Sequence, residues 1–446
     1  MKRTVQLFVL ILAFGPSVSA AELWFVGTHG DNGNSGRSYS EALATFSAAI
    51  DSASNSAGSD TLLVVAGDTL IGSATGQTIS GTVQVWAIEP ADSLSIKRSC
   101  RGFHLINSGI SNSFVVYANG STADATFWNC AVHANEGGIA ARAGFYSRDH
   151  AILTLHGCSA DGTSDWGYYS NLSGDLRAFG CTAHDNQLDG FKVTSNSAMT
   201  LTACLSLNNS AGKGFFAGAT SMMLLESCRA SGNPSGVYVS SGSTTRLTDC
   251  VLEDNGFGIF TNNADSVIVE GGVCSTFSDY GITGTSEDTT NIVLSRLIFC
   301  TPGPGATAVA YLGSATCEAD RVTIHGLNHA AGLLCGGSGT LTTTRSIITH
   351  CTTGAQATLG SLLLSSILFW NNSADLDGVA APDHVLRRNP LFLSPASSDF
   401  RLMPISPAAH YAEDKTTIGA QPVATQIPTS WGRPAWSRSD GLPSHP

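Results

Sequence analysis

A short phrase returns six times along this chain: an apolar residue, a cysteine, in most copies an asparagine, and then a glycine followed by apolar residues. The six cysteines are Cys130, Cys158, Cys181, Cys204, Cys228 and Cys250, spaced 28, 23, 23, 24 and 22 residues apart. A period in the low twenties, with short apolar alternations broken by Gly, Asn and Ser, is typical of a β-solenoid that winds one coil per repeat. No twelve-residue stretch of these repeats holds a 3.6-residue apolar period, which excludes a helical solenoid.

Two flanking segments extend the pattern over most of the chain. The repeats resemble those of right-handed parallel β-helix proteins of the pectate-lyase-like superfamily. Residues 23–70, beginning "LWFVGTHGDNGNSG", resemble the cap motif that opens many secreted bacterial members, and residues 389–422, beginning "NPLFLSPASSDF", resemble their closing motif. The resemblance implies an all-β fold, a right-handed single-stranded parallel β-helix with an N-terminal capping helix. It does not fix the function, because the superfamily includes lyases, hydrolases, epimerases, phage spikes and non-catalytic surface proteins.

The terminal segments of the sequence predict that the protein is exported and that a helix caps its β-helix. Residues 1–20 read as a signal peptide, with basic residues, a short apolar stretch and small residues before a cut between Ala20 and Ala21. We therefore expect a secreted protein, extracellular or periplasmic. Residues 21–95 are assigned to the N-terminal cap and first coils, 96–420 to the parallel β-helix, and 421–446 to a Pro/Ser-rich tail. Apolar residues on one helical face predict the capping helix between Tyr39 and Ala53.

The net charge of the chain disfavours some classes of binding partner. Lys and Arg number 22 against 34 Asp and Glu, a net charge of −12, which argues against nucleic acid and anionic membranes. Beyond the signal peptide no apolar run is long enough to cross a bilayer, so we expect no membrane insertion. We expect a monomer whose partner is a polysaccharide.

The repeated cysteines and asparagines have structural explanations. Stacked equivalent positions lie ~4.8 Å apart, whereas disulfide-bonded Cβ atoms lie ~3.8 Å apart, which favours a buried thiol stack over bridges between neighbouring coils. Occasional bridges remain the alternative. Five positions after the cysteine, an asparagine ladder is predicted at a tight turn, formed by Asn135, Asn186, Asn209, Asn233 and Asn255. The glycine that follows is interpreted as freedom for the backbone to leave that turn.

The residues after the glycine carry the candidate binding surface. Strand alternation predicts that one set points into the core: Ile139, Tyr168, Phe191, Phe215, Val237 and Ile259. The next set then points outward: Ala140, Tyr169, Lys192, Phe216, Tyr238 and Phe260. We call the last five of these the stripe. Its aromatic faces could hold a polysaccharide, with Arg142 and Asn171 as polar contacts beside them; the alternative is that the rings only stabilise one another.

Lys192 is the candidate catalytic residue. In β-elimination of a uronate polymer, a base removes the proton next to a carboxylate, and the developing charge must be neutralised. A lysine among aromatic rings can have its pKa lowered enough to serve as that base. The segment "HDNQLDGFKV" resembles acidic stretches near the lysine of certain calcium-dependent pectate lyases, which makes calcium the candidate cofactor and Asp185 and Asp189 its candidate ligands. It departs from them in offering only these two carboxylates, and solvated surface residues are the alternative.

Two functions therefore stay open at the level of the sequence. The first is a secreted β-helix protein that binds a polysaccharide and cleaves it by lyase-like β-elimination at the stripe. The second is a non-catalytic extracellular solenoid with a structural or adhesive role. An open groove that contains Lys192 and an arginine would favour the first.

Overall fold

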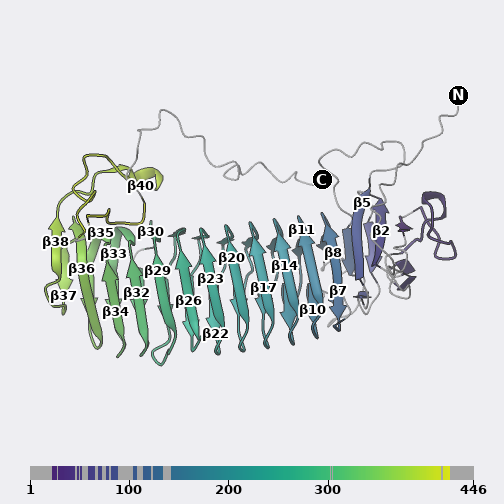
Figure 1. Cartoon of the computed structure of the whole chain (residues 1–446), viewed down its shortest axis with the longest axis horizontal. Coiled ribbons are helices and arrows are strands. Elements are labelled where there is room, and N and C mark those ends of the chain that lie inside the picture. Colours follow the sequence, from purple (N-terminus) through teal and green to yellow (C-terminus); the bar gives the residue numbers. More distant parts are fainter. Residues whose placement is uncertain are drawn as a thin grey trace.

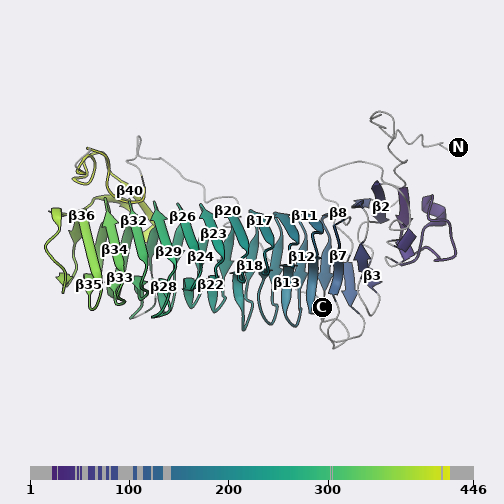
Figure 2. The same cartoon turned by 60° about the horizontal axis from the view of Figure 1, so that its bottom comes forward.

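The chain forms a rod of stacked coils, seen along its side in Figure 1 and turned in Figure 2. The computed structural model describes residues 23–27, 29–45, 48–49, 51–52, 59–65, 69–72, 77–79, 82–88, 104–107, 114–121, 124–133, 142–301, 303, 305–412 and 415–421. The predicted signal peptide and nearly all of the predicted tail lie outside these residues. No helix of the described part is long and apolar enough to cross a membrane.

Each complete coil contributes three strands, and each strand pairs in parallel with its counterparts in the neighbouring coils. The strands thus form three faces that run the length of the rod. Face 1 contains β4 (Gln77–Ile79), β7 (Phe114–Asn119), β10 (Ala143–Arg148), β13 (Trp166–Asn171), β16 (Phe191–Val193), β19 (Lys213–Ala217), β22 (Ser235–Ser240), β25 (Phe257–Asn262), β28 (Tyr280–Gly284), β31 (Thr307–Tyr311) and β37 (Ala374–Asp377). Face 2 contains β1 (Leu23–Val26), β2 (Ser59–Val65), β5 (Thr82–Ile88), β8 (Asp124–Trp128), β11 (Ile152–His156), β14 (Asp175–Phe179), β17 (Ala198–Thr202), β20 (Met222–Glu226), β23 (Thr244–Thr248), β26 (Ser266–Glu270), β29 (Asn291–Ser295), β32 (Thr316–Asp320) and β34 (Thr340–Thr344).

Face 3 contains the shortest strands and a set of long strands that turn a corner. The face 3 strands are β3 (Thr69–Gly72), β6 (His104–Asn107), β9 (Ala131–His133), β12 (Ser159–Asp161), β15 (Thr182–His184), β18 (Leu205–Leu207), β21 (Arg229–Ser231), β24 (Val251–Glu253), β27 (Val273–Ser275), β30 (Ile298–Cys300) and β38 (Asp383–Arg387). The long strands span two faces: β33 (Thr323–Cys335) and β35 (Ile347–Ala357) run from face 3 to face 1, and β36 (Ser361–Trp370) runs from face 2 to face 3. The predicted right-handed parallel β-helix is confirmed.

The N-terminal capping helix stays a prediction. Tyr39–Glu41 form a 3-10 turn (η1), Ala42 is extended and Leu43 forms a parallel bridge with Val26, so residues 42–45 are not helical and the predicted helix does not begin at Tyr39. Helical backbone is described at residues 48–49 and 51–52, and residues 46–47, 50 and 53 lie outside the described residues. Ala49 is buried together with Val26 and Leu43, so this end of the rod has an apolar cover. Parallel pairing already begins at β1, which pairs with β2.

The core is a column of inward side chains that stack from coil to coil. Tyr168 and Phe191 stack at 4.5 Å between ring centroids, Phe191 and Phe215 at 5.3 Å, and all three rings are fully buried. Val237 and Ile259 continue the column. The inward assignment from strand alternation is therefore confirmed for the five residues that the structure describes.

The repeated cysteines form the predicted buried stack. Cys130 to Cys250 are all at most 4% exposed, and the eleven cysteines of the described residues carry free thiols. Several thiols donate to a backbone carbonyl of the preceding coil, such as Cys204 Sγ to Ala178 O at 3.3 Å and Cys228 Sγ to Leu201 O at 3.4 Å. Burial raises the thiol pKa of Cys274 and Cys317, which disfavours reactive thiolates.

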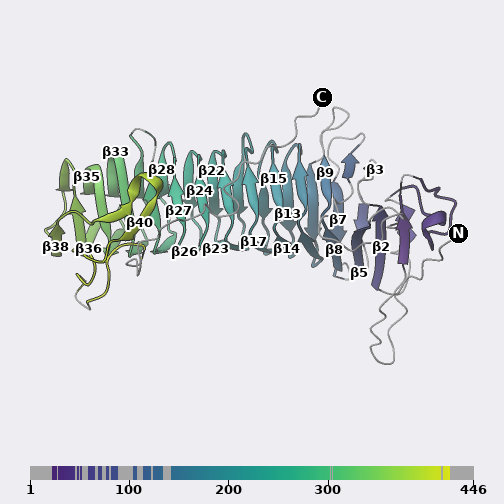
Figure 3. The ribbon, with the colours of Figure 1, turned by 90° about the horizontal axis from the view of Figure 1, so that it is seen from above.

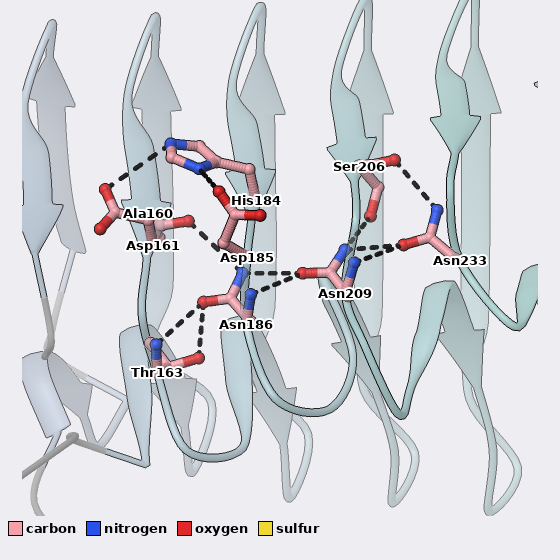
Figure 4. A network of polar contacts seen from close by, with 9 residues as sticks. All are labelled: Ala160, Asp161, Thr163, His184, Asp185, Asn186, Ser206, Asn209 and Asn233. Carbon is pink, nitrogen blue, oxygen red and sulfur yellow. Dashed lines mark hydrogen bonds and ion pairs between the residues drawn. The ribbon is translucent and has the colours of Figure 1, made fainter. Parts of the chain in front are cut away.

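The asparagine ladder closes the turn between face 3 and face 1 (Figure 4). Asn186 Nδ2 donates to Asn209 Oδ1 at 3.0 Å, Asn209 Nδ2 to Asn233 Oδ1 at 2.9 Å, and Asn233 Nδ2 to Asn255 Oδ1 at 3.2 Å. Each of these oxygens also accepts the backbone N–H of the preceding asparagine. Thr163 takes the ladder position in the repeat that lacks asparagine, and its hydroxyl donates to Asn186 Oδ1 at 2.7 Å.

The glycines after this turn are required by close packing, which corrects the interpretation from sequence. At Gly167 a Cβ atom would lie 2.8 Å from Gly190 O, and at Gly214 it would lie 2.6 Å from Gly236 O. The ladder amide Asn233 Nδ2 would lie 3.2 Å from the same added atom at Gly214. These glycines do not have a positive φ; a side chain there would push neighbouring coils apart.

The closing segment folds back over the outside of the rod (Figure 3). It comprises β39 (Phe392–Ser394), η2 (Pro395–Ser397), the antiparallel β40 (Asp399–Leu402) and the residues up to 421. Its apolar side chains, Phe400 and Ile418 among them, form a small cluster with Ile298 and Ile347 of the coils beneath. The outer surface of these coils is therefore covered.

The thiol stack predicts a simple chemical result. We expect the native protein to resist a thiol reagent, because the stacked thiols are buried, and the denatured, non-reduced protein to titrate most of its cysteines. Counting thiols with and without denaturant measures both. Denatured protein whose cysteines are mostly oxidised would contradict the stack.

The ladder predicts a local loss of stability on truncation. Asn209→Ala leaves the backbone N–H of Asn186 without its acceptor and removes one of the two acceptors of the Asn186 amide, which keeps only Ala160 O. Each buried unpaired donor costs about 1–3 kcal/mol. Denaturant unfolding of Asn209→Ala should show this decrease. Ser210→Ala is the matched control, because Ser210 is the exposed neighbouring residue. Equal stabilities of the two variants would show that the ladder contributes nothing.

Candidate functional site

The stripe lies on face 1, one position beyond the inward aromatic column. Tyr169 pairs in register with Lys192, Lys192 with Phe216, Phe216 with Tyr238, and Tyr238 with Phe260. Lys192, Phe216, Tyr238 and Phe260 are half-buried, and Tyr169 is 8% exposed. The side chains of the stripe therefore form one row on the outside of five consecutive coils, as strand alternation predicted.

The register predicted for the first coil is wrong. Phe145, not Ile139, pairs with Tyr168, and Tyr146, not Ala140, pairs with Tyr169. The spacing between Cys130 and Cys158 is longer than the others. The sequence alignment placed the extra residues after a strand at Ile139, whereas in the structure they precede the strand, which is β10. Tyr146 stacks on Tyr169 at 4.8 Å and extends the aromatic row by one coil.

A second column, which we call the side column, runs beside the stripe. It consists of the residues that precede the repeated glycines, and at its centre are Trp166, Asp189 and Lys213 on three successive coils. Backbone hydrogen bonds hold these positions in neighbouring coils. The N–H of Gly167 donates to Asp189 O at 3.1 Å, and the N–H of Gly190 donates to Lys213 O at 2.9 Å. The charged residues of the side column therefore lie directly beside Lys192.

Lys192 occupies the only lysine position of the stripe and lies among three aromatic rings. Its ammonium lies 4.5 Å from the ring centroid of Trp166, 4.8 Å from that of Phe216 and 5.9 Å from that of Tyr169. Its side chain is 19% exposed, and its nitrogen lies 3.5 Å from Asp189 Oδ2. The rings remove water from the amine while one carboxylate stays within reach.

Burial lowers the pKa of Lys192 from its ordinary value of 10.5, and the nearby positive charge of Lys213 lowers it further. Asp189 opposes this shift, because its carboxylate stabilises the ammonium form. The direction of the net shift shows that desolvation outweighs the ion pair. The lysine is thus closer to being a usable base than a solvated lysine would be.

Most ring faces of the stripe are occupied by neighbouring side chains, so the stacking of sugar on them stays a prediction. Phe216 and Tyr238 stack at 5.3 Å with an interplanar angle of 11°, and Tyr238 and Phe260 stack at 5.3 Å and 8°. Tyr238 is therefore covered on both faces, and Phe216 has Lys192 against its other face. Phe260 stacks on Tyr238 on one face and makes a T-shaped contact with Phe257 at 5.2 Å. A ligand on these rings would contact edges and the tyrosine hydroxyl.

Arg142 and Asn171 were both expected beside the stripe, and their outcomes differ. Arg148, not Arg142, pairs with Asn171 in register. Arg142 precedes β10 and still reaches the site, since its Nε lies 2.6 Å from Asp165 Oδ2 and its guanidinium lies 5.1 Å from the Trp166 ring. Asn171 is in the expected position; its Oδ1 accepts from Thr194 Oγ1 at 3.1 Å, and that hydroxyl also bonds the Tyr169 hydroxyl.

Asp185 and Asp189, the candidate calcium ligands, have separate partners. Asp189 is buried, with Oδ1 accepting the backbone N–H of Lys213 at 2.9 Å and Oδ2 facing Lys192. Asp185 is exposed and bonds His184 Nδ1 at 2.9 Å on the other side of the asparagine ladder, next to Asp161 (Figure 4). Among the residues that the structure describes, no group of three or more His, Cys, Asp and Glu could hold a metal ion.

Sequence reasoning missed Tyr146 and Trp166. The signal for Trp166 was available, because it precedes a repeated glycine just as Asp189 and Lys213 do. Trp166 is 8% exposed, its ring contacts both Arg142 and Lys192, and its Nε1 has no hydrogen-bond partner among the described residues. The site is thus a row of aromatic edges interrupted by a lysine, with a tryptophan, a carboxylate and a second lysine beside it.

Comparisons with known proteins agree with the fold. A family model described as "Right handed beta helix region" matches residues 89–223 and 205–306. A search of curated protein sequences finds no match. The repeats are therefore right-handed β-helix repeats, and the predicted resemblance to pectate-lyase-like β-helix proteins is confirmed as a resemblance of fold.

Several solved structures are similar at low identity. The mannuronan C-5 epimerase AlgE4 A-module of Azotobacter vinelandii is 17% identical, over 77% of this chain and 92% of its own, with a TM-score of 0.45. The pectate lyase Pel9A is 14% identical, over 91% of this chain and 98% of its own, with a TM-score of 0.40. The Agl-KA catalytic domain is 13% identical, over 77% and 65%, with a TM-score of 0.43. At these values the similarity carries no argument about activity.

The position of Tyr238 on the outside of the rod predicts a small effect of truncation on stability. Tyr238→Ala should lower the free energy of unfolding by about 0.5–1.5 kcal/mol for each lost ring pair. Phe215→Ala, in the inward column of the adjoining coil, should cost about 3–5 kcal/mol. Parallel denaturant unfolding measures both variants. A loss for Tyr238→Ala as large as that for Phe215→Ala would place its ring in the core.

Proposed function

We propose that this protein binds an acidic polysaccharide across the stripe and cleaves it by β-elimination, with Lys192 as the base. The observation that supports this is the position of the Lys192 amine, desolvated by three rings on the outer face of the rod and next to one buried carboxylate. An outward lysine of ordinary function would extend into water, because solvating its charge is favourable. Secretion stays a prediction of the N-terminal sequence.

The proposed reaction needs one proton transfer at the stripe. The neutral amine of Lys192 takes the proton from the sugar carbon that bears the carboxylate, and the electrons of that C–H bond form a carbon–carbon double bond. The bond between the neighbouring carbon and the glycosidic oxygen breaks, and the leaving oxygen takes a proton from water. The hydroxide that remains takes the proton from the Lys192 ammonium, which restores the neutral amine. The products are a saturated chain end and an unsaturated uronate end.

Asp189 and Trp166 would act through Lys192. As the amine gains the proton it becomes an ammonium that faces Asp189 Oδ2, so the buried carboxylate stabilises the protonated product. Trp166 keeps water from the amine and lies against both Lys192 and Arg142. Both residues would therefore position and tune the base and would not react themselves.

The alternative function is a non-catalytic structural or adhesive solenoid. The observation that favours it is that Tyr238 is stacked on both faces and Phe216 is covered by Tyr238 and Lys192. On this alternative the stripe stabilises the rod and Lys192 only neutralises Asp189. The two functions differ in whether an unsaturated product forms.

We expect Lys192→Ala to lower the rate of β-elimination by ~10²–10⁴-fold, the usual contribution of a proton-transfer group. The assay is the ultraviolet absorbance of unsaturated products from polygalacturonate and alginate. Arg246→Ala, which removes a cation from face 2, is the matched control and should keep the wild-type rate. Wild-type protein that releases no unsaturated product from either polymer would contradict the lyase proposal.

The pH dependence supplies a further check on the same residue. The base must be neutral, so the rate should rise with pH and reach half its plateau below pH 10.5, because burial lowers the pKa of Lys192 from that value. Lys192→Arg should be inactive at every pH, since a guanidinium stays protonated. A rate that falls as the pH rises from neutral would contradict Lys192 as the base.

A further inference from the structure

The proposed elimination leaves one question open: which group neutralises the substrate carboxylate. The resemblance to calcium-dependent lyases implies calcium, which prefers six to eight oxygen ligands, several of them carboxylates. The donors present do not fit that ion. Asp189 has one oxygen on the backbone N–H of Lys213 and the other on Lys192, and Asp185 bonds His184 on the far side of the ladder turn.

Lys213 is the cation best placed to take that role. It lies in the side column, one coil beyond Asp189, and its ammonium lies 5.4 Å from the ring centroid of Tyr238. Its side chain is half-buried, and its backbone is fixed by the hydrogen bond to Asp189 Oδ1. Its charge reaches the base, since it contributes to lowering the pKa of Lys192.

The other cations of the site are already compensated. Arg142 pairs with Asp165 at 2.6 Å, and Lys192 pairs with Asp189 at 3.5 Å. Within the described residues, Lys213 has a ring contact but no ion pair. The uncompensated positive charge beside the base is therefore that of Lys213, which is where a substrate anion would be attracted.

We propose that Lys213 binds the uronate carboxylate next to the scissile bond and that elimination at this site requires no divalent metal ion. This inference rests on the proposed function and assigns its charge-neutralising group. As the C–H bond breaks, negative charge builds on the carboxylate, and a fixed ammonium beside it stabilises that charge. The carboxylate would then contact Lys213, while the hydrogen on the carbon that bears it faces Lys192.

The experiment compares wild type, Lys213→Ala, Lys213→Arg and the control Arg246→Ala. Each is assayed for polyuronate binding by calorimetry and for unsaturated product, once with a calcium chelator and once with added calcium. We expect wild type to be equally active in both conditions. Lys213→Ala should lose affinity and ~10²–10³-fold in rate, as removal of a charge-stabilising group does. Lys213→Arg should retain much of both.

The other possible results separate a failure of this inference from a failure of the proposed function. A chelator that silences wild type, with recovery on adding calcium, overturns the inference and leaves the proposed function intact. Lys213→Ala that binds and cleaves as Arg246→Ala does also overturns it. Binding without cleavage contradicts the lyase proposal, while a loss of that binding in Lys213→Ala still supports the carboxylate contact. Wild type that neither binds nor cleaves overturns both proposals.

Discussion

The in-register stacking of parallel strands is the constraint on which the rest of this structure depends. Because every coil repeats its backbone about one strand spacing further along the rod, a residue type that recurs in sequence becomes a continuous column in space. The asparagine ladder, the thiol stack and the inward aromatic column are three such columns. The glycines beside the ladder keep the coils close enough for its amide hydrogen bonds to form.

The candidate site arises where that repetition is broken. Lys192 replaces an aromatic residue in one coil of the stripe, and the side column changes from Trp166 to Asp189 to Lys213 over three coils. A charged residue inserted between Tyr169 and Phe216 loses hydration from both sides at once. The same stacking that stabilises the rod thereby shifts the pKa of the inserted lysine.

The sequence predicted those parts of the fold that follow from period and alternation alone. The parallel β-helix, the buried cysteines, the asparagine ladder and the direction of Phe191 against Lys192 all follow from spacing. The first coil was misregistered because a spacing does not say on which side of a strand the extra residues lie. The covered ring faces and the separate partners of Asp185 and Asp189 depend on side-chain conformation, which no spacing determines.

The central claim is that Lys192 is a tuned base rather than a stabilising ion-pair partner. The most direct test is an NMR titration of the lysine side chains, with Lys192→Ala used to assign its signal and a uronate oligosaccharide then added. We expect the pKa of Lys192 to lie below its ordinary value of 10.5 and to change when the oligosaccharide binds. A pKa at or above 10.5 that does not respond to the oligosaccharide would contradict the account.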